Sequence, residues 1–309
     1  MRKLQRKTLD RIRKSHTRLL LDYPGVSGIS VGNKITDGEE TKEPCIRVFV
    51  EEKLPEKKLS DVIPKSLSGV RTDVIKADFR TMLASSGMSN AVRKRPVVGG
   101  ISIGTVDQAI SGTITLVVLY KRDPDNLYAL SCSHVLCSDD ILNKVREVAQ
   151  PGPSDSGGLI PENTIGKVAF AQLTNNLDAA IASILPPEQG RRHKINELTT
   201  KIDAIGVARE GLTLCKIGKV TGEQVFGHVV DTAFPCNLLY PSGERYLHSR
   251  AILVESVNAE PFMLPGDSGA LAYDRYGAAV GMMIGGDEKT RFGVANHFSE
   301  VVAGMEIDL

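Results

Sequence analysis

The sequence predicts a mostly β protein with a small α+β unit in front of it, and two observations support this fold class. From Val97 onward, short runs of apolar and β-branched residues are separated by Gly, Pro, Asn or Asp. Many short strands without helical periods between them are typical of an all-β barrel or sandwich, here of about 210 residues. Before Val97, a helical pattern and a few alternating runs lead into a Ser- and Gly-rich stretch, the usual composition of a linker. We therefore predict an N-terminal unit with its linker over residues 1–92 and a second domain over residues 93–309.

The composition excludes several function classes. The chain has 309 residues, is 41% hydrophobic and carries a net charge of +1, which predicts a soluble globular protein without a general affinity for nucleic acid. It holds no apolar run long enough for a membrane span, and its Lys- and Arg-rich start is no secretory signal. Five cysteines, an odd number, then indicate reduced thiols and a cytoplasmic protein.

The N-terminal unit begins with a helical pattern over residues 1–22, which Pro24-Gly25 ends. Residues 2–18 are strongly basic, and such a helix can contact nucleic acid or anionic lipid. A solvated helix that docks through a narrow apolar face is the more common outcome, so we expect no nucleic-acid partner. Further along the unit we expect strands over residues 26–32, 46–50 and 70–75, a polar turn over residues 36–44, and a linker over residues 80–96.

The second domain should be built from short strands and end in a helix. We expect strands over residues 112–120, 127–131, 164–170, 177–184, 225–230, 252–257 and 271–284, and a closing helix over residues 298–305.

The run Gly266-Asp267-Ser268-Gly269 is the first candidate site. A tight turn of small residues can present a serine hydroxyl, and the backbone N–H groups of Gly266 and Ser268 can point at one spot where an oxyanion develops. An ordinary Asp-Ser-Gly turn is the alternative. A second Asp-Ser-Gly run occurs at Asp155-Ser156-Gly157-Gly158. Only one of the two serines can be the nucleophile, so at least one of these runs must be an ordinary turn.

Two further residues complete a candidate catalytic triad. His134 follows an apolar run at the point where a strand should give way to a loop, which can hold an imidazole rigidly and leave one ring nitrogen open. Asp178 heads an otherwise apolar strand, and a buried carboxylate there needs a donor such as a histidine N–H. The order His134, Asp178, Ser268 is that of chymotrypsin-like enzymes, and it leaves Ser156 without a fitting triad.

Residues 97–309 resemble the trypsin-like, or chymotrypsin-type, serine peptidases. The motifs that match are the turn at Ser268, the run Ser133-His134-Val135-Leu136, and the apolar strand that contains Asp178. The run Cys215-Lys216-Ile217-Gly218 is similar to the start of the second barrel in bacterial α-lytic-type members. The loop from Gln150 to Gly158 is similar to one in an intracellular bacterial and plant branch, the narrow-leaf type.

The resemblance implies a double β-barrel with the triad in the cleft between the barrels, and a serine endopeptidase that works through an acyl-enzyme. Ser268 would attack, His134 would act as base and then acid, Asp178 would orient the imidazole, and the amides of Gly266 and Ser268 would form the oxyanion hole. A protein or peptide would be the substrate, and no cofactor is needed. The alternative is a catalytically idle trypsin-like module that binds rather than cleaves, with residues 1–92 as the surface for a regulatory protein partner.

The resemblance also indicates a specificity pocket. Its base would be Phe262, six residues before Ser268, followed by Met263. The opposite wall would hold Met283, Gly285 and Gly286, with Gly293 further on. An open apolar pocket of this kind favours Leu, Met or Phe before the cleaved bond. Only if one of the nearby acids, Glu260, Asp287 or Glu288, reached the pocket would Arg or Lys be preferred.

Some residues depart from the family pattern. Cys132 and Cys137 flank His134 without the usual disulfide spacing, and the sequence does not decide whether they, or Cys215 and Cys236, ever pair. A zinc site at Cys132, His134 and Cys137 lacks a fourth ligand, so no metal is expected.

Val97-Val98-Gly99-Gly100 resembles the amino terminus that zymogen cleavage creates, whose freed amine pairs with the Asp before the nucleophile. Here Arg95-Pro96 puts proline at the cut. We therefore expect Asp267 to be paired internally.

Overall fold

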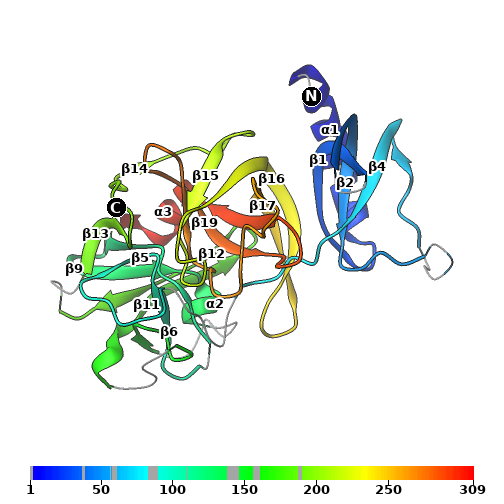
Figure 1. The fold of residues 1–309 in the computed structure, drawn as a ribbon. Coiled ribbons are helices and arrows are strands. Elements are labelled where there is room, and N and C mark those ends of the chain that lie inside the picture. The colour runs from blue at the N-terminus through cyan, green and yellow to red at the C-terminus, as the bar shows by residue number, and fades with distance from the viewer. Residues whose placement is uncertain are drawn as a thin grey trace.

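The computed structural model describes residues 3–36, 39–55, 57, 61–82, 90–108, 110–137, 146–155, 161–186 and 190–309. Within these residues the fold is mostly β and chymotrypsin-like, with a helix-plus-sheet unit in front (Figure 1). In the described ranges, no helix has the length and apolar character needed to cross a membrane.

The N-terminal unit packs one helix on a small sheet. Its elements are α1 (Lys3–Leu21), β1 (Val26–Thr36), β2 (Glu39–Val50), β3 (Ser66–Leu67) and β4 (Val70–Lys76). Leu9 and Leu20 of α1 are buried against Ile29 and Val48, so the narrow apolar face docks the helix. The polar segment that we expected as a turn instead extends the ladder of β1 and β2, with Asn33 opposite Pro44, because backbone pairing does not require apolar side chains.

The first barrel follows the order β21-β8-β9-β12-β11-β10-β6-β7. Its strands are β6 (Ser102–Thr105), β7 (Gly112–Thr113), β8 (Leu116–Tyr120), β9 (Asp123–Ser131), β10 (Glu147–Ala149), β11 (Thr164–Thr174), β12 (Leu177–Ile184) and β21 (Ile307–Asp308). Because β7 runs on into β8 after Ile114 and Thr115, the chain itself joins one end strand of this sheet to the strand next to its other end. Its apolar interior includes Leu116, Leu130 and Ile181.

The second barrel is a closed ring in the order β15-β18-β19-β20-β17-β16, since β15 also pairs with β16. Its strands are β15 (Thr213–Lys216), β16 (Val225–Leu239), β17 (Arg245–Ser256), β18 (Leu271–Tyr273), β19 (Ala278–Gly286) and β20 (Phe292–His297). The strand that we expected over residues 271–284 is divided into β18 and β19, because Asp274 and Gly277, with φ of 84°, form a turn between them.

The remaining elements lie around the barrels. They are β5 (Val97–Gly99), α2 (Ser133–Leu136), a 3-10 helix (Pro161–Asn163), β13 (Gly190–Ile195), β14 (Ala204–Ile205) and α3 (Phe298–Met305). The helix α3 begins and ends where the sequence predicts.

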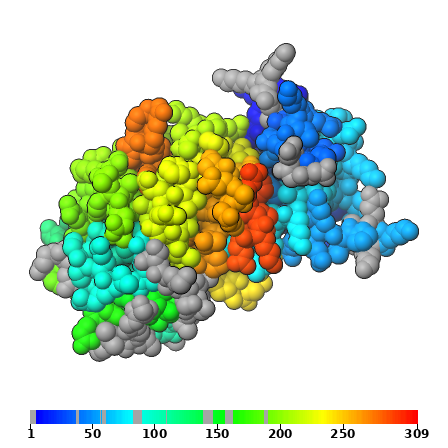
Figure 2. Space-filling model, in the orientation of Figure 1, coloured from blue at the N-terminus to red at the C-terminus, as the bar shows by residue number. Residues whose placement is uncertain are grey.

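The N-terminal unit joins the second barrel through one continuous sheet. β1 pairs with β16 at Gly28 and Cys236, and a Cβ on Gly28 would lie 2.4 Å from the ring of Phe234. Phe49 of β2 packs edge-to-face on both Phe234 and Phe292, at 5.6 and 5.2 Å between ring centroids. The blue N-terminal residues accordingly lie directly against the C-terminal half of the chain (Figure 2).

The expected linker over residues 80–96 is wrong in its first residues. Arg80 exchanges backbone hydrogen bonds with Gly286, and Thr81 donates to Leu239, so this segment lies between two edges of the second barrel. The Ser- and Gly-rich residues 83–89 lie outside the described part of the chain. The contacts of Arg80 and Thr81 with the second barrel are backbone hydrogen bonds. The pattern of side chains in the sequence therefore could not predict them.

Candidate active site

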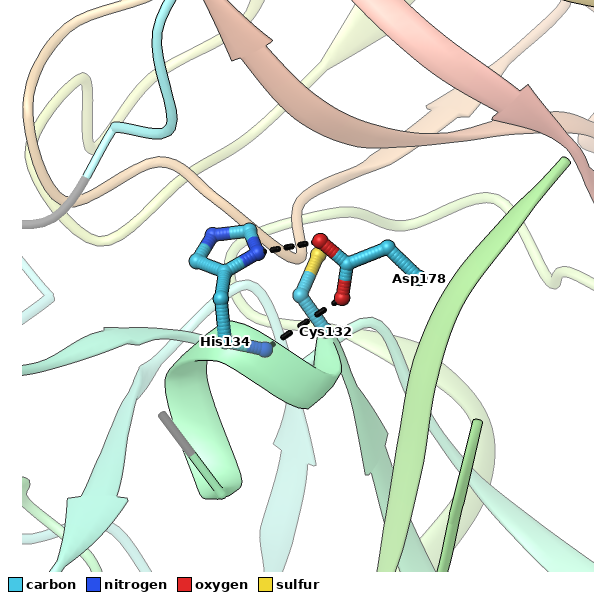
Figure 3. Close-up of side chains that lie close together, drawn as sticks. All are labelled: Cys132, His134 and Asp178. Carbon is cyan, nitrogen blue, oxygen red and sulfur yellow. Dashed lines mark hydrogen bonds and ion pairs between the residues drawn. The ribbon is translucent and has the colours of Figure 1, made fainter. Parts of the chain in front are cut away.

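His134 and Asp178 both come from the first barrel and contact each other. His134 lies in the short helix α2, which follows β9 where we expected a loop, and Asp178 is the second residue of β12. The strands β9 and β12 pair directly, with Ser131 opposite Ala180. The Nδ1 atom of His134 lies 2.5 Å from Oδ2 of Asp178, and both side chains are fully buried (Figure 3).

Asp178 is held as a carboxylate by several donors. Its Oδ1 accepts from the backbone N–H and the hydroxyl of Ser133, each at 2.7 Å, and Oδ2 accepts from the hydroxyl of Tyr240 at 2.7 Å. Burial by itself raises the pKa of Asp178, but His134 and these hydrogen bonds outweigh burial and hold the pKa well below its usual range. An ionised Asp178 keeps the proton of His134 on Nδ1, which leaves Nε2 free to act as a base.

Tyr240 is a site residue that the sequence analysis missed. It follows β16 in the second barrel, and its hydroxyl also lies 2.9 Å from Nε2 of His248. Because the ionised Asp178 can only accept, Tyr240 donates to it, and Nε2 of His248 must donate to the Tyr240 oxygen. Burial lowers the pKa of His248 to about 4, so this histidine is neutral at pH 7. No local signal marks Tyr240, because it approaches Asp178 from the other barrel.

The turn at Ser268 has the conformation that its glycines permit. Gly266 and Gly269 have φ of 108° and 94°, a region that favours glycine, and a Cβ on Gly269 would lie 2.0 Å from the carbonyl oxygen of Thr113. Thr113 of the first barrel also donates its backbone N–H to the Ser268 carbonyl at 2.7 Å and its hydroxyl to the Gly266 carbonyl at 2.8 Å. The first barrel therefore fixes the turn.

Asp267 is paired internally, as expected. Its carboxylate lies 2.6 Å from Nζ of Lys216, both side chains are fully buried, and the amides of Val220 and Thr221 donate to its other oxygen. Lys216 supplies the cation that a freed amino terminus would otherwise bring. The sequence places Lys216 in the run Cys215-Lys216-Ile217-Gly218, but nothing in that run indicates that Lys216 pairs with Asp267. In the second Asp-Ser-Gly copy, Asp155 pairs with the buried Lys219 at 2.9 Å, whereas Ser156 lies outside the described residues.

Ser268 lies against the segment that contains His134. A Cβ on Gly112 would lie 2.5 Å from Val135 and 2.8 Å from the Ser268 carbonyl oxygen, so the neighbour of His134 and the turn contact the same glycine. The Oγ atom of Ser268 accepts from the backbone N–H of Met82 at 2.9 Å and donates to the Ile284 carbonyl at 3.3 Å. The buried Nε2 of His134 has no hydrogen-bond partner within the described residues.

The expected oxyanion amides both contact one oxygen. Gly266 and Ser268 donate their backbone N–H groups to the carbonyl of Met82, at 2.6 and 3.3 Å. Two donors that converge on one carbonyl oxygen, beside a serine hydroxyl, have the arrangement that stabilises a developing oxyanion.

Three of the expected pocket residues belong to the same buried apolar cluster as Met82. Phe262, Met263 and Met283 are fully buried in one apolar cluster with it. Gly293 lies under this cluster, since a Cβ there would be 2.9 Å from both Phe262 and Met283. Gly285 and Gly286 form the rim, where they contact the backbone of Arg80 and the side chain of Met263.

The acids that could have changed the pocket lie elsewhere. The carboxylate of Asp287 accepts backbone N–H groups from Asp78 and Lys289, and the side chains of Glu260 and Glu288 are exposed.

Within the part of the chain that the structure describes, the group of possible ligands around His134 does not have the chemistry of an ordinary metal site. Potential ligand atoms of Cys132, His134 and Asp178 lie within 4.8 Å of one another. Burial, with a further contribution from Asp178, raises the pKa of the Cys132 thiol well above its usual value, and this thiol donates to the Met283 carbonyl. A protonated thiol is a poor ligand, and Nδ1 of His134 is already bonded to Asp178. All five cysteines are buried, and none of them is in a disulfide bond.

The two barrels define a chymotrypsin-like fold, which the helix-plus-sheet unit precedes, and the chain resembles the chymotrypsin-like serine proteases. Residues 5–79 match the model of the NARROW LEAF 1 N-terminal domain. Among solved structures, the chain is similar to a glutamic acid-specific serine protease, with 16% identity, a TM-score of 0.49, and coverage of 68% of this chain and 98% of that one. It is also similar to Thermobifida fusca protease A, with 15% identity, a TM-score of 0.49, and coverage of 69% and 97%. Cellulomonas bogoriensis chymotrypsin is similar at 15% identity and a TM-score of 0.47, with coverage of 69% and 97%. A comparison with curated protein sequences gave no match.

Proposed function

We propose that this protein is a serine endopeptidase that cleaves peptide bonds through an acyl-enzyme. The observation that carries the proposal is the convergence of the Gly266 and Ser268 amides on one peptide carbonyl oxygen, beside the hydroxyl of Ser268. The pairing of His134 with a buried, ionised Asp178 supports it, because this pair leaves a basic Nε2 and stabilises the imidazolium that forms.

In the proposed reaction, Ser268 attacks the substrate carbonyl while His134 accepts its proton and then passes that proton to the leaving amine. Water then attacks the acyl-enzyme with His134 again as the base. The apolar pocket of Phe262, Met263 and Met283 favours Leu, Met or Phe before the cleaved bond, since a desolvated cation would find no partner there. Library profiling that gave a dominant Arg or Lys would contradict this preference.

The alternative, a catalytically idle binding module, is favoured by one observation. The Ser268 hydroxyl donates to Ile284, and His134 Nε2 makes no hydrogen bond within the described part of the chain. Bonds between catalytic groups often form only in the substrate complex, so an active enzyme can have the same geometry.

A fluorophosphonate probe separates the two functions, because it labels only a serine that a neighbouring base activates. In wild type we expect the probe to label Ser268. Ser268→Ala should not be labelled, and in His134→Ala the rate of labelling should fall by several orders of magnitude. Ser156→Ala is the matched control and should label like the wild type. No labelling of any folded variant, including one in which Met82 is displaced, would contradict the proposal.

A further inference from the structure

Residues 79–82 lie in the candidate site, where Arg80 forms isolated β-bridges with both Leu239 and Gly286. Arg80 donates to and accepts from Gly286, each at 3.0 Å, while Phe79 accepts from Leu239 and Thr81 donates to it, at 3.0 and 2.9 Å. Alternate residues thus bond to opposite edges of the second barrel. This is the way in which an extended peptide adds to an exposed strand edge.

The chain direction brings a peptide carbonyl to Ser268. After Arg80 and Thr81, Met82 donates its N–H to the Ser268 hydroxyl at 2.9 Å, and its carbonyl oxygen accepts from the Gly266 and Ser268 amides. The Met82 carbonyl oxygen therefore occupies the place of a developing oxyanion, beside the hydroxyl that binds the N–H of the same residue, with the preceding residues on its acyl side.

The side chain of Met82 is buried in the apolar cluster that contains the expected pocket residues. It is 1% exposed and lies in one cluster with Phe262, Met263 and Met283. Methionine is unbranched and apolar, so it fits a deep pocket of this chemistry. The segment therefore satisfies the backbone and the side-chain requirements of the site together.

The N-terminal unit holds the segment in place. Asp78 donates its N–H to Asp287 at 3.0 Å, and its carboxylate lies 2.6 Å from the Arg245 guanidinium. The ring of Phe79 packs on Phe49 and Phe234, at 5.3 Å to each. A tethered segment meets the site at a high effective concentration and without the entropic cost of a second molecule.

We propose that residues 79–82 are an internal substrate and that Ser268 cleaves the peptide bond after Met82 in its own chain. This inference rests on the proposed peptidase function. The Ser268 oxygen forms an ester with the Met82 carbonyl carbon, and its proton passes through His134 to the amide nitrogen of the next residue, Leu83, as the C–N bond breaks. Water then hydrolyses the ester, which restores Ser268, leaves a carboxylate on Met82, and gives a new amino terminus at Leu83.

Intact-mass spectrometry of the purified full chain over time tests the inference. We expect wild type to convert into fragments 1–82 and 83–309, and Ser268→Ala to stay intact. Mixing untagged wild type with a mass-tagged Ser268→Ala chain should leave the tagged chain whole, because the reaction is intramolecular. Cleavage at another bond, or of the tagged chain, would overturn the inference.

Variants of the segment test whether its seating in the pocket causes the cleavage. Met82→Asp places a carboxylate in the apolar pocket and should slow cleavage more than 100-fold, whereas Met82→Leu should cleave. Lys76→Ala is the matched control and should cleave like wild type, because the Lys76 side chain is exposed at the end of β4 and lies outside the docked segment. Equal cleavage rates in Met82→Asp and wild type would refute the role of the pocket.

Fluorophosphonate labelling of Met82→Asp distinguishes the failure of this inference from the failure of the proposed function. If Ser268 is labelled in Met82→Asp while wild type remains intact, residues 79–82 are a bound blocker and self-cleavage is wrong. If neither chain is labelled nor cleaved, both the peptidase function and the inference fail. If Met82→Asp does not fold, the comparison of the intact masses of wild type and Ser268→Ala still tests self-cleavage.

Discussion

At the scale of single residues, the candidate site depends on a chain of hydrogen bonds that crosses both barrels. His134 donates to Asp178, Tyr240 donates to the same carboxylate, and His248 donates to Tyr240. Each member is fully or almost fully buried, so an unpaired member would be costly. The orientation of His134 consequently depends on residues up to three hydrogen bonds away, the last of them His248.

Removal of the Tyr240 hydroxyl should impair the reaction without removing a catalytic group. Tyr240→Phe takes one donor from Asp178, and a hydrogen bond to a charged group contributes about 1.5–3 kcal/mol, so we expect phosphonylation of Ser268 to slow roughly 10- to 100-fold. Tyr246→Phe is the control, since its hydroxyl lies 3.4 Å from the exposed Glu244. Equal rates in the two variants would show that Tyr240 does not position the pair.

His248 should make the folded state sensitive to mild acid. Burial lowers its pKa to about 4 in the folded protein, against about 6.5 in an unfolded chain. Between these values only the unfolded state binds the proton, so the free energy of unfolding falls as the pH drops, by at most about 1.4 kcal/mol per unit. The pKa of Asp178 is also lowered, but stability from a lowered carboxylate pKa is lost only below about pH 4.

Denaturant titrations at pH 7 and pH 5 measure this effect. His248→Gln keeps a donor for Tyr240 and should flatten the loss of stability between the two pH values. His228→Gln, at an exposed position, should keep the wild-type slope. A wild-type slope in His248→Gln would mean that another group carries the acid sensitivity.

At the scale of elements, two basic residues of α1 have an internal role. Arg13 is buried, lies 3.3 Å from Asp231 of β16 and donates to the Ala233 carbonyl at 2.7 Å, while Arg6 lies 2.7 Å from Glu210. Lys7, Arg11, Lys14 and Arg18 remain exposed. The basic run therefore contains residues that dock the helix as well as a solvated face.

The ion pair of Arg13 should be important for stability. Asp231→Ala leaves a buried guanidinium without its carboxylate and also removes the acceptor of Ser30. Breaking a buried pair from one side costs about 3–5 kcal/mol, and we expect a loss near the lower value because Arg13 keeps the Ala233 carbonyl. Arg11→Ala, on the exposed face of α1, should change the free energy of unfolding by less than about 0.5 kcal/mol. Similar losses in both variants would contradict this role.

At the scale of the whole molecule, noncovalent contacts hold the N-terminal unit against the second barrel, in addition to the chain that connects them. The pairing of β1 with β16, the contacts of Phe49 with Phe234 and Phe292, and the ion pair of Arg245 with Asp78 all cross the boundary. We infer that residues 1–78 restrain the site, because the segment that fills it leads directly out of this unit.

A cut between Met82 and Arg95 should therefore leave one particle. The Ser- and Gly-rich composition there predicts ready cutting by an added protease. Size-exclusion chromatography with light scattering should give one species for the cut chain under native conditions and two in denaturant. The same cut in Phe49→Ala should release the N-terminal fragment more easily. Separation of the native wild-type pieces would show that residues 1–78 are an independent domain.

The sequence by itself determined the features that local chemistry controls. The short apolar runs predicted the β-rich region, Pro24-Gly25 marked the end of α1, and the glycines around Ser268 predicted a tight turn with converging amides. Periodicity and backbone freedom decide these features within a few residues. The resemblance in chain order then singled out His134 and Asp178 before any contact between them was known.

The tertiary structure alone decided which groups those residues meet. Met82 lies in a segment that we expected to be linker, Tyr240 reaches Asp178 from the other barrel, and Lys216 pairs with Asp267 across 51 residues of chain. Met82 is bound largely through backbone N–H and C=O groups, which every residue but proline carries alike. Tyr240 and Lys216 depend on the relative placement of strands far apart in the chain. Neither kind of contact leaves a periodic pattern in the sequence, because packing between distant elements sets it.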